Sequence, residues 1–182
     1  MERRHKIIVS VFAALVAIVA VIGVVVAFSS HTAKDQAVPP GTLGVGKTAP
    51  NFTLPGVNGG TVTLDAFRGK PVILTFGAAY CGPCHQEFPL LAKAAKQHPN
   101  VSVVGVDPED LPGDMQQMMR QTGAKWPMAD DRQGDVAARY GVTTLPITFF
   151  VNGRGTIVAS GFGLTSQSLV DAPLNKLLHA PA

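Results

Sequence analysis

Cysteine is scarce in this chain of 182 residues, which contains only Cys81 and Cys84. Two cysteines cannot form the several disulfides that hold a small secreted scaffold together, and they cannot complete a four-cysteine zinc site. No two of the five histidines have the close spacing of a zinc-ligand pair, so histidine does not supply the missing ligands. The two cysteines are therefore either one disulfide or a redox-active dithiol.

A strong surplus of charge is also lacking. The formal net charge is +3, and Arg3, Arg4 and Lys6 against Glu2 account for +2 of it. From Lys47 onward, 11 Lys and Arg residues stand against 10 Asp and Glu residues. This balance leaves no basic stripe for nucleic acid, which is not expected as a partner. Apolar residues make up 46% of the chain, enough to bury a substantial core.

One long apolar run stands apart, because residues 7–28 contain no charged side chain. A helix that rises ~1.5 Å per residue crosses a ~30 Å hydrocarbon core over this length. Basic residues precede the run, so we expect a cytoplasmic N-terminus at 1–6, a signal-anchor helix at 7–28 and the remainder outside the cytoplasm. The predicted localisation is the cell membrane, with a single span and an extracytoplasmic domain.

Two alternatives exist for this run. The apolar part of a cleaved signal peptide usually has ~7–15 residues, which is shorter than the run found here. Arg3 and Arg4 could belong to a twin-arginine signal, but two arginines before a long apolar span are ordinary topology determinants. We therefore favour a retained anchor.

The rest of the chain predicts a linker and one α/β domain. Residues 29–46 are small or polar with several Pro and Gly residues, as in a tether, and the domain spans 47–182. Continuous or alternating β-formers predict strands at 61–64, 72–76, 101–106, 147–151 and 156–159. Helical patterns cover 83–98, with Pro89 inside, and 114–122, 135–140 and 165–179. This order predicts a central mixed sheet flanked by helices on both faces, with 147–159 as a hairpin.

The spacing of the cysteines points to redox chemistry. Cys81 falls where a buried strand turns into a helix, among unpaired N–H groups and the positive end of the helix dipole. Both effects favour the thiolate over the thiol. Cys84 follows one turn later, close enough to form a disulfide with Cys81. We therefore interpret Cys81 as the nucleophile and Cys84 as the resolving thiol of thiol–disulfide exchange.

Other interpretations of the two cysteines remain open. An inert structural disulfide is weakly supported, because so short a loop constrains the unfolded chain little. Cys81 to His85 matches the CxxCH attachment sequence of c-type haem, with Met115, Met118 or Met119 as an axial ligand. A haem or copper module for electron transfer or metal delivery is therefore the alternative function. In the dithiol interpretation His85 is a partly solvated residue of the first helical turn.

A set of short motifs resembles one known family. The set runs through the segments 49–54, 67–72, Phe76, 81–84, 87–89, 140–142, 145–146 and Gly155. In this order it resembles the thioredoxin superfamily, and more closely the membrane-tethered TlpA/ResA-type redoxins of bacterial cell envelopes. The resemblance implies a thioredoxin-like fold and a thiol–disulfide oxidoreductase that needs no cofactor besides the redox-active disulfide Cys81–Cys84. The implied partners are protein thiol or disulfide substrates and a membrane or extracytoplasmic redox partner.

The resemblance also implies roles for Pro146 and Glu87. Pro146 corresponds to the family's cis-proline, beside the dithiol, where the preceding backbone pairs with a bound peptide. Glu87 falls where ResA-type proteins carry an acidic residue behind the cysteines. A buried Glu87 would have a raised pKa and could accept the proton of Cys84, whereas the alternative is a solvated glutamate on the helix surface.

The sequence departs from the family at several positions around the cysteines. Thr75 stands where classical thioredoxins carry a buried aspartate, which leaves Glu87 as the nearest carboxylate. Gly77 and Tyr80 stand where tryptophan is common in the family. The PxxxTxxC pattern of peroxiredoxins is absent, so peroxidase activity is not expected. CGPC resembles reducing thioredoxins, while an oxidising envelope could use the same residues for disulfide formation.

Overall fold

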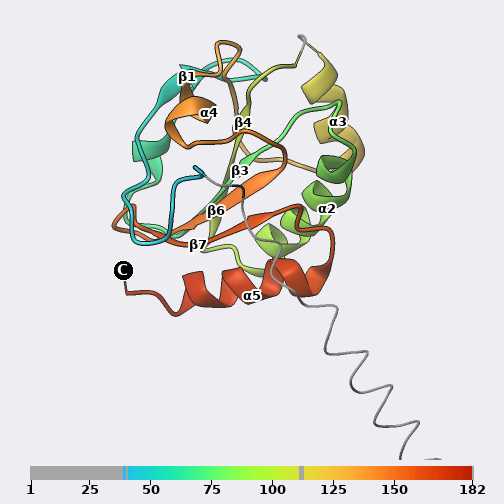
Figure 1. Ribbon diagram of the computed structural model, residues 1–182. Coiled ribbons are helices and arrows are strands. Elements are labelled where there is room, and N and C mark those ends of the chain that lie inside the picture. Colours follow the sequence, from blue (N-terminus) through green and yellow to red (C-terminus); the bar gives the residue numbers. More distant parts are fainter. Residues whose placement is uncertain (1–38, 40, 111–112, 182) are drawn as a thin grey trace, which may run out of the picture. The chain divides into compact units, whose positions relative to one another are not determined.

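The computed structural model describes residues 39, 41–110 and 113–181 (Figure 1). The predicted anchor at 7–28, the basic segment at 1–6 and most of the predicted linker lie outside the described residues. Within the described part of the chain, no helix has the length and apolar character needed to cross a bilayer.

A five-stranded mixed sheet forms the centre of the domain, in the order β5-β4-β3-β6-β7. β4 pairs in parallel with both β3 and β5, whereas β6 is antiparallel to β3 and to β7. The mixed sheet and the β6–β7 hairpin confirm the prediction from sequence. The strands are β3 (Val72–Phe76), β4 (Ser102–Asp107), β5 (Met128–Asp130), β6 (Ile147–Val151) and β7 (Ile157–Phe162).

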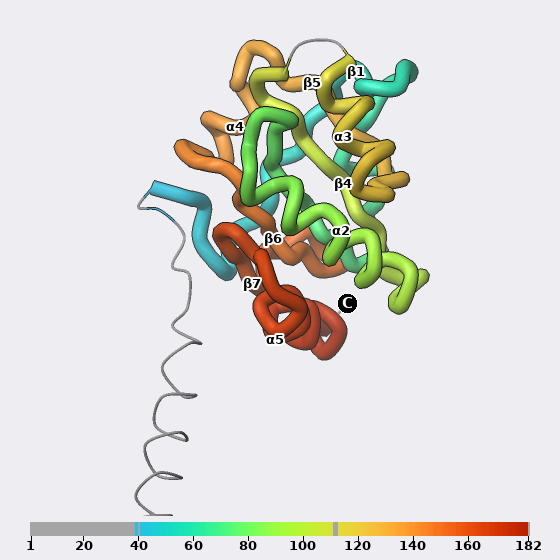
Figure 2. The backbone as a smooth tube through the Cα atoms, turned by 90° about the vertical axis from the view of Figure 1, so that its right-hand side faces the viewer, coloured from blue at the N-terminus to red at the C-terminus, as the bar shows by residue number. Residues whose placement is uncertain are grey.

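Helices cover both faces of this sheet, as predicted. Apolar side chains of α2, α3 and α5 pack with Ile73, Val103 and Phe150 on one face. Side chains of α4, of the hairpin formed by β1 (Thr53–Pro55) and β2 (Thr61–Thr63), and of a short 3-10 helix pack on the other face, with Leu74 and Val104. In Figure 1, α2 and α3 lie on the right of the sheet, and β1 and α4 on the left. Figure 2 looks onto this right-hand side, where α2 lies in front of the strands. The helices are α2 (Gly82–Gln97), α3 (Asp114–Thr122), α4 (Asp135–Arg139), α5 (Gln167–Leu178) and η1 (Leu64–Phe67).

Three short elements were missed by the sequence interpretation. β1 (Thr53–Pro55) pairs with β2 (Thr61–Thr63) in a small separate sheet, and η1 follows it. β5 has only three residues, and it forms the sheet edge directly after Trp126 and Pro127. Elements of three or four residues carry little periodicity, and of those in this domain only β2 was predicted, at 61–64. Trp126 is buried next to the edge strand and packs its ring 5.3 Å from that of Phe88.

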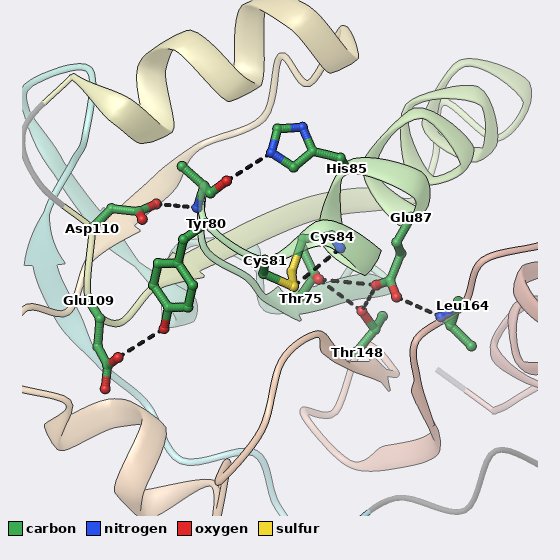
Figure 3. The surroundings of a disulfide bond; sticks show 11 residues. Thr75, Tyr80, Cys81, Cys84, His85, Glu87, Glu109, Asp110, Thr148 and Leu164 are labelled. Atoms are coloured by element: carbon green, nitrogen blue, oxygen red, sulfur yellow. Dashed lines mark hydrogen bonds between the residues drawn. A yellow bond between two sulfur atoms is a disulfide. The ribbon is translucent and has the colours of Figure 1, made fainter.

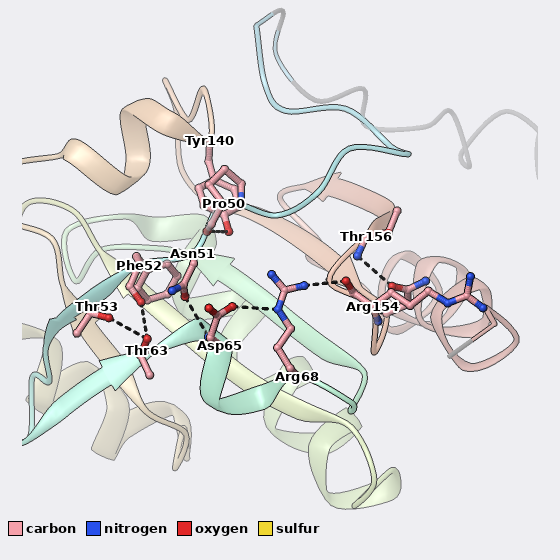
Figure 4. Close-up of polar contacts among 11 residues, drawn as sticks. Pro50, Asn51, Phe52, Thr53, Thr63, Asp65, Arg68, Tyr140, Arg154 and Thr156 are labelled. Atoms are coloured by element: carbon pink, nitrogen blue, oxygen red, sulfur yellow. Dashed lines mark hydrogen bonds and ion pairs between the residues drawn. The ribbon is translucent and has the colours of Figure 1, made fainter.

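Several of the family-like residues hold the start of the domain against the sheet (Figure 4). The Arg68 side chain forms an ion pair with Asp65 and donates a hydrogen bond of 2.7 Å to the Arg154 carbonyl. Gly155 has φ +81°, and a Cβ there would collide with the Arg68 guanidinium. The Tyr140 hydroxyl donates to the Pro50 carbonyl at 2.7 Å. These residues therefore serve the architecture and lie apart from the cysteines.

Candidate active site

The two cysteines lie at the junction of β3 and α2 and are joined in a disulfide. Cys81 is the N-cap of α2, and its sulfur accepts a hydrogen bond of 3.2 Å from the Cys84 N–H. Pro83 occupies the first turn of the helix, where its missing N–H costs nothing. After reduction, a thiolate at Cys81 would face the unpaired N–H groups and the positive end of the helix dipole.

The two sulfur-bearing residues differ in accessibility. Cys81 is 7% exposed and Cys84 is 0% exposed. A groove of about 620 Å³ opens beside Cys81 and is bordered by Tyr80, by Pro83 and by the segment 142–145. An incoming disulfide can therefore reach Cys81 from solvent, while Cys84 is covered by the domain.

Pro146 lies beside the disulfide because of the register of the central strands. Phe76 of β3 pairs with Ile147 of β6, so one step further Gly77 faces Pro146. A Cβ on Gly77 would lie 2.9 Å from the Phe88 ring and 3.4 Å from the Cys84 sulfur, which places Gly77 against the disulfide. A tryptophan at position 77 would therefore require the Phe88 ring to shift. The Leu145–Pro146 peptide bond is cis, which confirms the prediction.

Glu87 points into the domain and is 0% exposed, so the alternative of a solvated surface glutamate is wrong (Figure 3). Its Oε1 accepts hydrogen bonds from the hydroxyls of Thr148 and, at 3.4 Å, of Thr75. Its Oε2 accepts the Leu164 N–H at 2.7 Å. Burial raises the pKa of Glu87 above its ordinary value, although these three hydrogen bonds act in the opposite direction.

The AhpC/TSA family model matches residues 45–160. The chain belongs to the AhpC/TSA family. It is 31% identical over 136 residues to the thiol-disulfide oxidoreductase ResA of Bacillus subtilis, covering 74% of this chain and 76% of ResA. The fold and the paired cysteines agree with this similarity, and the chain is a thiol–disulfide oxidoreductase of the ResA type.

Two solved structures lead to the same conclusion. A putative thiol:disulfide interchange protein DsbE from Chlorobium tepidum is 30% identical, with a TM-score of 0.67 over 75% of this chain and 99% of that protein. A secreted Mycobacterium tuberculosis disulfide oxidoreductase, described as homologous to E. coli DsbE, is 27% identical with a TM-score of 0.63. That match covers 68% of this chain and 94% of the mycobacterial protein. The predicted thioredoxin-like fold and oxidoreductase activity are thus confirmed.

The structure adds acidic residues that sequence analysis of this AhpC/TSA domain missed. Asp107 ends β4, and its Oδ1 accepts the N–H of Asp110 at 3.1 Å. The Asp110 carboxylate accepts a hydrogen bond from the Ala79 N–H, two residues before Cys81. Burial, and next the charge of Asp110, raise the pKa of Asp107 to about 7. The sequence carries only a partial signal, since acidic residues follow directly after a buried strand, and the sheet order is needed to show that this strand end lies beside the end of β3.

Tyr80 and His85 complete the surroundings of the segment before Cys81. The Tyr80 ring is exposed, and its hydroxyl donates a hydrogen bond of 2.9 Å to the Glu109 carboxylate. His85 lies on the exposed side of the first turn of α2, as predicted, with Nε2 2.8 Å from the Ala79 carbonyl oxygen. Both residues of the chain directly before Cys81 are therefore tied to neighbouring side chains.

The raised pKa of Glu87 predicts a pH-dependent contribution to stability. The folded state binds this proton more tightly than the unfolded state does. The contribution is therefore full below about pH 4 and is lost as the pH rises through the folded-state pKa. In Glu87→Gln this titration is absent. We expect the free energy of unfolding of wild type minus that of Glu87→Gln to decrease from about pH 4 to about pH 8 in urea titrations of the oxidised proteins.

Asp107 and Asp110, whose pKa values are also raised, are present in both proteins. Their contribution cancels from the difference as long as the substitution leaves them in place. A difference that is constant over this pH range would contradict the assignment of a buried, titrating Glu87.

Proposed function

We propose that this enzyme exchanges its Cys81–Cys84 disulfide or dithiol with protein substrates outside the cytoplasm, with Cys81 as the attacking sulfur. The observation that carries the proposal is the asymmetry of the pair, since only Cys81 borders the groove while Cys84 is fully buried. The start of α2 supports the same assignment, because it favours a thiolate at Cys81.

The reaction in the reducing direction has two steps. The Cys81 thiolate attacks one sulfur of a substrate disulfide, forming a mixed disulfide and releasing the other substrate sulfur as a thiolate. Cys84 then loses its proton and attacks the Cys81 sulfur, which releases the second substrate thiolate and forms the Cys81–Cys84 disulfide. Two electrons pass from the enzyme dithiol to the substrate disulfide. The same steps in reverse oxidise a substrate dithiol, and the difference in reduction potential sets the direction.

The segment before Pro146 offers a binding edge for the substrate. Residues 143–145 border the groove, and their backbone groups make no hydrogen bond with any other described part of the chain. An extended substrate segment can pair with such free N–H and C=O groups, as in strand addition to a sheet edge. We propose that Pro146, the residue at the end of this edge, positions the substrate disulfide against Cys81.

The proposed roles of the cysteines predict unequal trapping by serine variants. Cys84→Ser keeps the attacking sulfur but cannot resolve, so mixed disulfides with substrate proteins should accumulate and appear on non-reducing gels. Cys81→Ser should accumulate few, because its remaining sulfur is buried. The reversed order would assign the attack to Cys84, and equal trapping would contradict the proposed asymmetry.

Glu87 is proposed to accept the proton of Cys84 during resolution. It lies three residues after Cys84, about one turn along α2. Its carboxylate is held from three sides by Thr75, Thr148 and the Leu164 N–H. Burial raises its pKa toward the range in which a carboxylate can take a proton from a thiol.

This role predicts a slower second step in Glu87→Gln. The substitution retains size and removes the base, so decay of the mixed disulfide should slow by ~10²-fold or more, while the first attack by Cys81 remains close to that of wild type. Single-turnover mixing with a protein disulfide over a range of pH separates the two steps. Asp171→Asn makes the same chemical change on the exposed side of α5 and serves as the control. Superimposable pH profiles for wild type and Glu87→Gln would reject the role.

We further propose that the segment 7–28 retains the enzyme at the cell membrane, with the oxidoreductase domain outside the cytoplasm. The apolar length of the segment and the basic residues before it support this topology. The mycobacterial relative is described as secreted, which is consistent with an extracytoplasmic place of action. The redox partner would then be another thiol protein of the cell envelope.

The anchor predicts that the full-length protein sediments with membranes and resists extraction by salt and alkali. External protease should degrade the domain in intact spheroplasts. A chain without residues 1–28 but with a cleavable export signal should be soluble and equally exposed. A mature N-terminus near residue 30 in the soluble fraction would contradict the anchor.

A further inference from the structure

The segment that carries Cys81 into the site makes a sharp turn between β3 and α2. Cys81 donates its N–H to the Ala78 carbonyl at 3.1 Å, so the chain reverses within four residues. Ala79 and Tyr80 form the outer part of this turn, and neither makes a backbone–backbone hydrogen bond to another residue that the structure describes. The orientation of the Cys81 sulfur therefore depends on the side chains that bind the backbone of Ala79 and Tyr80.

Asp110 binds this turn through a backbone N–H group. Its Oδ2 accepts the Ala79 N–H, while His85 Nε2 lies 2.8 Å from the carbonyl oxygen of the same residue (Figure 3). The backbone N–H groups of Ala79 and Tyr80 both act to lower the pKa of Asp110. Partial burial acts against them and is the larger effect, so the pKa is raised overall. The carboxylate is thus fixed to the turn at a cost in desolvation.

Asp110 is itself held in place from the sheet. Asp107, the last residue of β4, is 4% exposed and accepts the N–H of Asp110 and, at 3.4 Å, of Glu109. β4 is hydrogen-bonded to β3 up to its end, and the Gly77 N–H donates to the Val106 carbonyl at 3.1 Å. These hydrogen bonds at the end of β4 therefore hold Asp110 in a position from which its carboxylate reaches the turn before Cys81.

We propose that Asp110 is a positioning residue that sets the orientation of Cys81 for attack, through its hydrogen bond to the Ala79 N–H. This inference rests on the proposed function, in which Cys81 is the attacking sulfur. The hydrogen-bond acceptor at position 110, rather than its negative charge, is the useful property. The acceptor oxygen orients Cys81 for attack. The negative charge, in contrast, disfavours a thiolate on Cys81 because it lies so close to the turn.

Other titratable groups also face this region and must stay constant in a test. Asp107 contacts Asp110 from β4, and Asp114 acts on it from α3 through its charge. Glu109 and Tyr80 form a hydrogen-bonded pair beside it, and His85 approaches from α2. Substitutions confined to position 110 leave all five unchanged.

Two variants separate geometry from charge without opening a cavity. Asp110→Asn keeps an acceptor oxygen at the same distance from the backbone and removes the charge. Asp110→Glu keeps the charge and moves the acceptor by one methylene. Asp114→Asn removes an exposed charge nearby that makes no hydrogen bond to residues 78–81, and is the control.

The measurement is the second-order rate constant for attack of the reduced enzyme on insulin disulfides, followed by stopped flow from about pH 5 to about pH 9. The high-pH limit of this rate constant reports geometry, and the apparent pKa reports the charge near Cys81. We expect Asp110→Asn to keep the limiting rate within about twofold of wild type with a lower apparent pKa. We expect Asp110→Glu to lower the limiting rate on the order of tenfold with little change in apparent pKa.

Each outcome decides the proposal. A limiting rate that falls in Asp110→Asn as much as in Asp110→Glu, or in neither, would overturn the positioning role. Thermal unfolding monitors the fold, and the insensitivity of the limiting rate in Asp114→Asn monitors general charge effects. Alkylation of the Cys84→Ser enzyme reports the Cys81 thiol directly. A wild-type enzyme whose Cys81 alkylates normally but does not attack insulin would refute the proposed function rather than the role of Asp110.

Discussion

The register between β3 and β6 is the constraint on which the site depends. All five residues of β3 are buried, and Thr75 pairs with Thr148 in the antiparallel ladder. The same register sets Gly77 opposite Pro146, next to the disulfide. Side chains alternate between the two faces of a sheet, so a slip of β6 by one residue would turn Thr148 away from Glu87. The apolar packing that fixes the register therefore also fixes the polar partners of the buried carboxylate.

Convergence of strand ends explains why residues far apart in the sequence meet here. β3 and β4 are parallel, so their carboxyl ends lie at one edge of the sheet, whereas the antiparallel β6 begins at that edge. β3 leads into the turn before Cys81. Asp107 and Asp110 lie at and just after the end of β4, and Pro146 lies just before the start of β6. The groove beside Cys81 lies where these three ends and α2 come together.

Sequence patterns predicted the elements that carry a strong local signal. The strands Val72–Phe76 and Ile147–Val151 and the helix Asp114–Thr122 have the predicted bounds, because runs of β-formers and flanking glycines delimit them. β1 and β5 were missed because their formation depends on a partner strand more than on their own three residues. Pairing of this kind is a tertiary property that a local pattern does not contain.

The residues of the site also differ in how far the sequence alone predicted them. The spacing of Cys81 and Cys84 at a strand-to-helix junction indicated the redox chemistry directly, whereas Pro146 and Glu87 were singled out by resemblance. The burial of Glu87 was not readable from the sequence, because a glutamate on an amphipathic helix ordinarily faces solvent. The contact of Asp110 with Ala79 required knowledge that β4 lies beside β3, which only the sheet order provides.

Buried carboxyl groups in the region of the redox site suit a reaction that moves protons together with electrons. A solvated carboxylate has a pKa near 4 and holds almost no protons at neutral pH. Burial raises the pKa of Glu87, and it raises the pKa of Asp107 to about 7. A carboxylate whose pKa is raised is a stronger base than a solvated one, which favours transfer of a proton from a thiol. Their burial costs stability as the pH rises, and hydrogen bonds from Thr148, Leu164 and the backbone of Asp110 offset part of that cost. The domain thus gives up some stability around its redox site by burying carboxyl groups whose pKa values are raised.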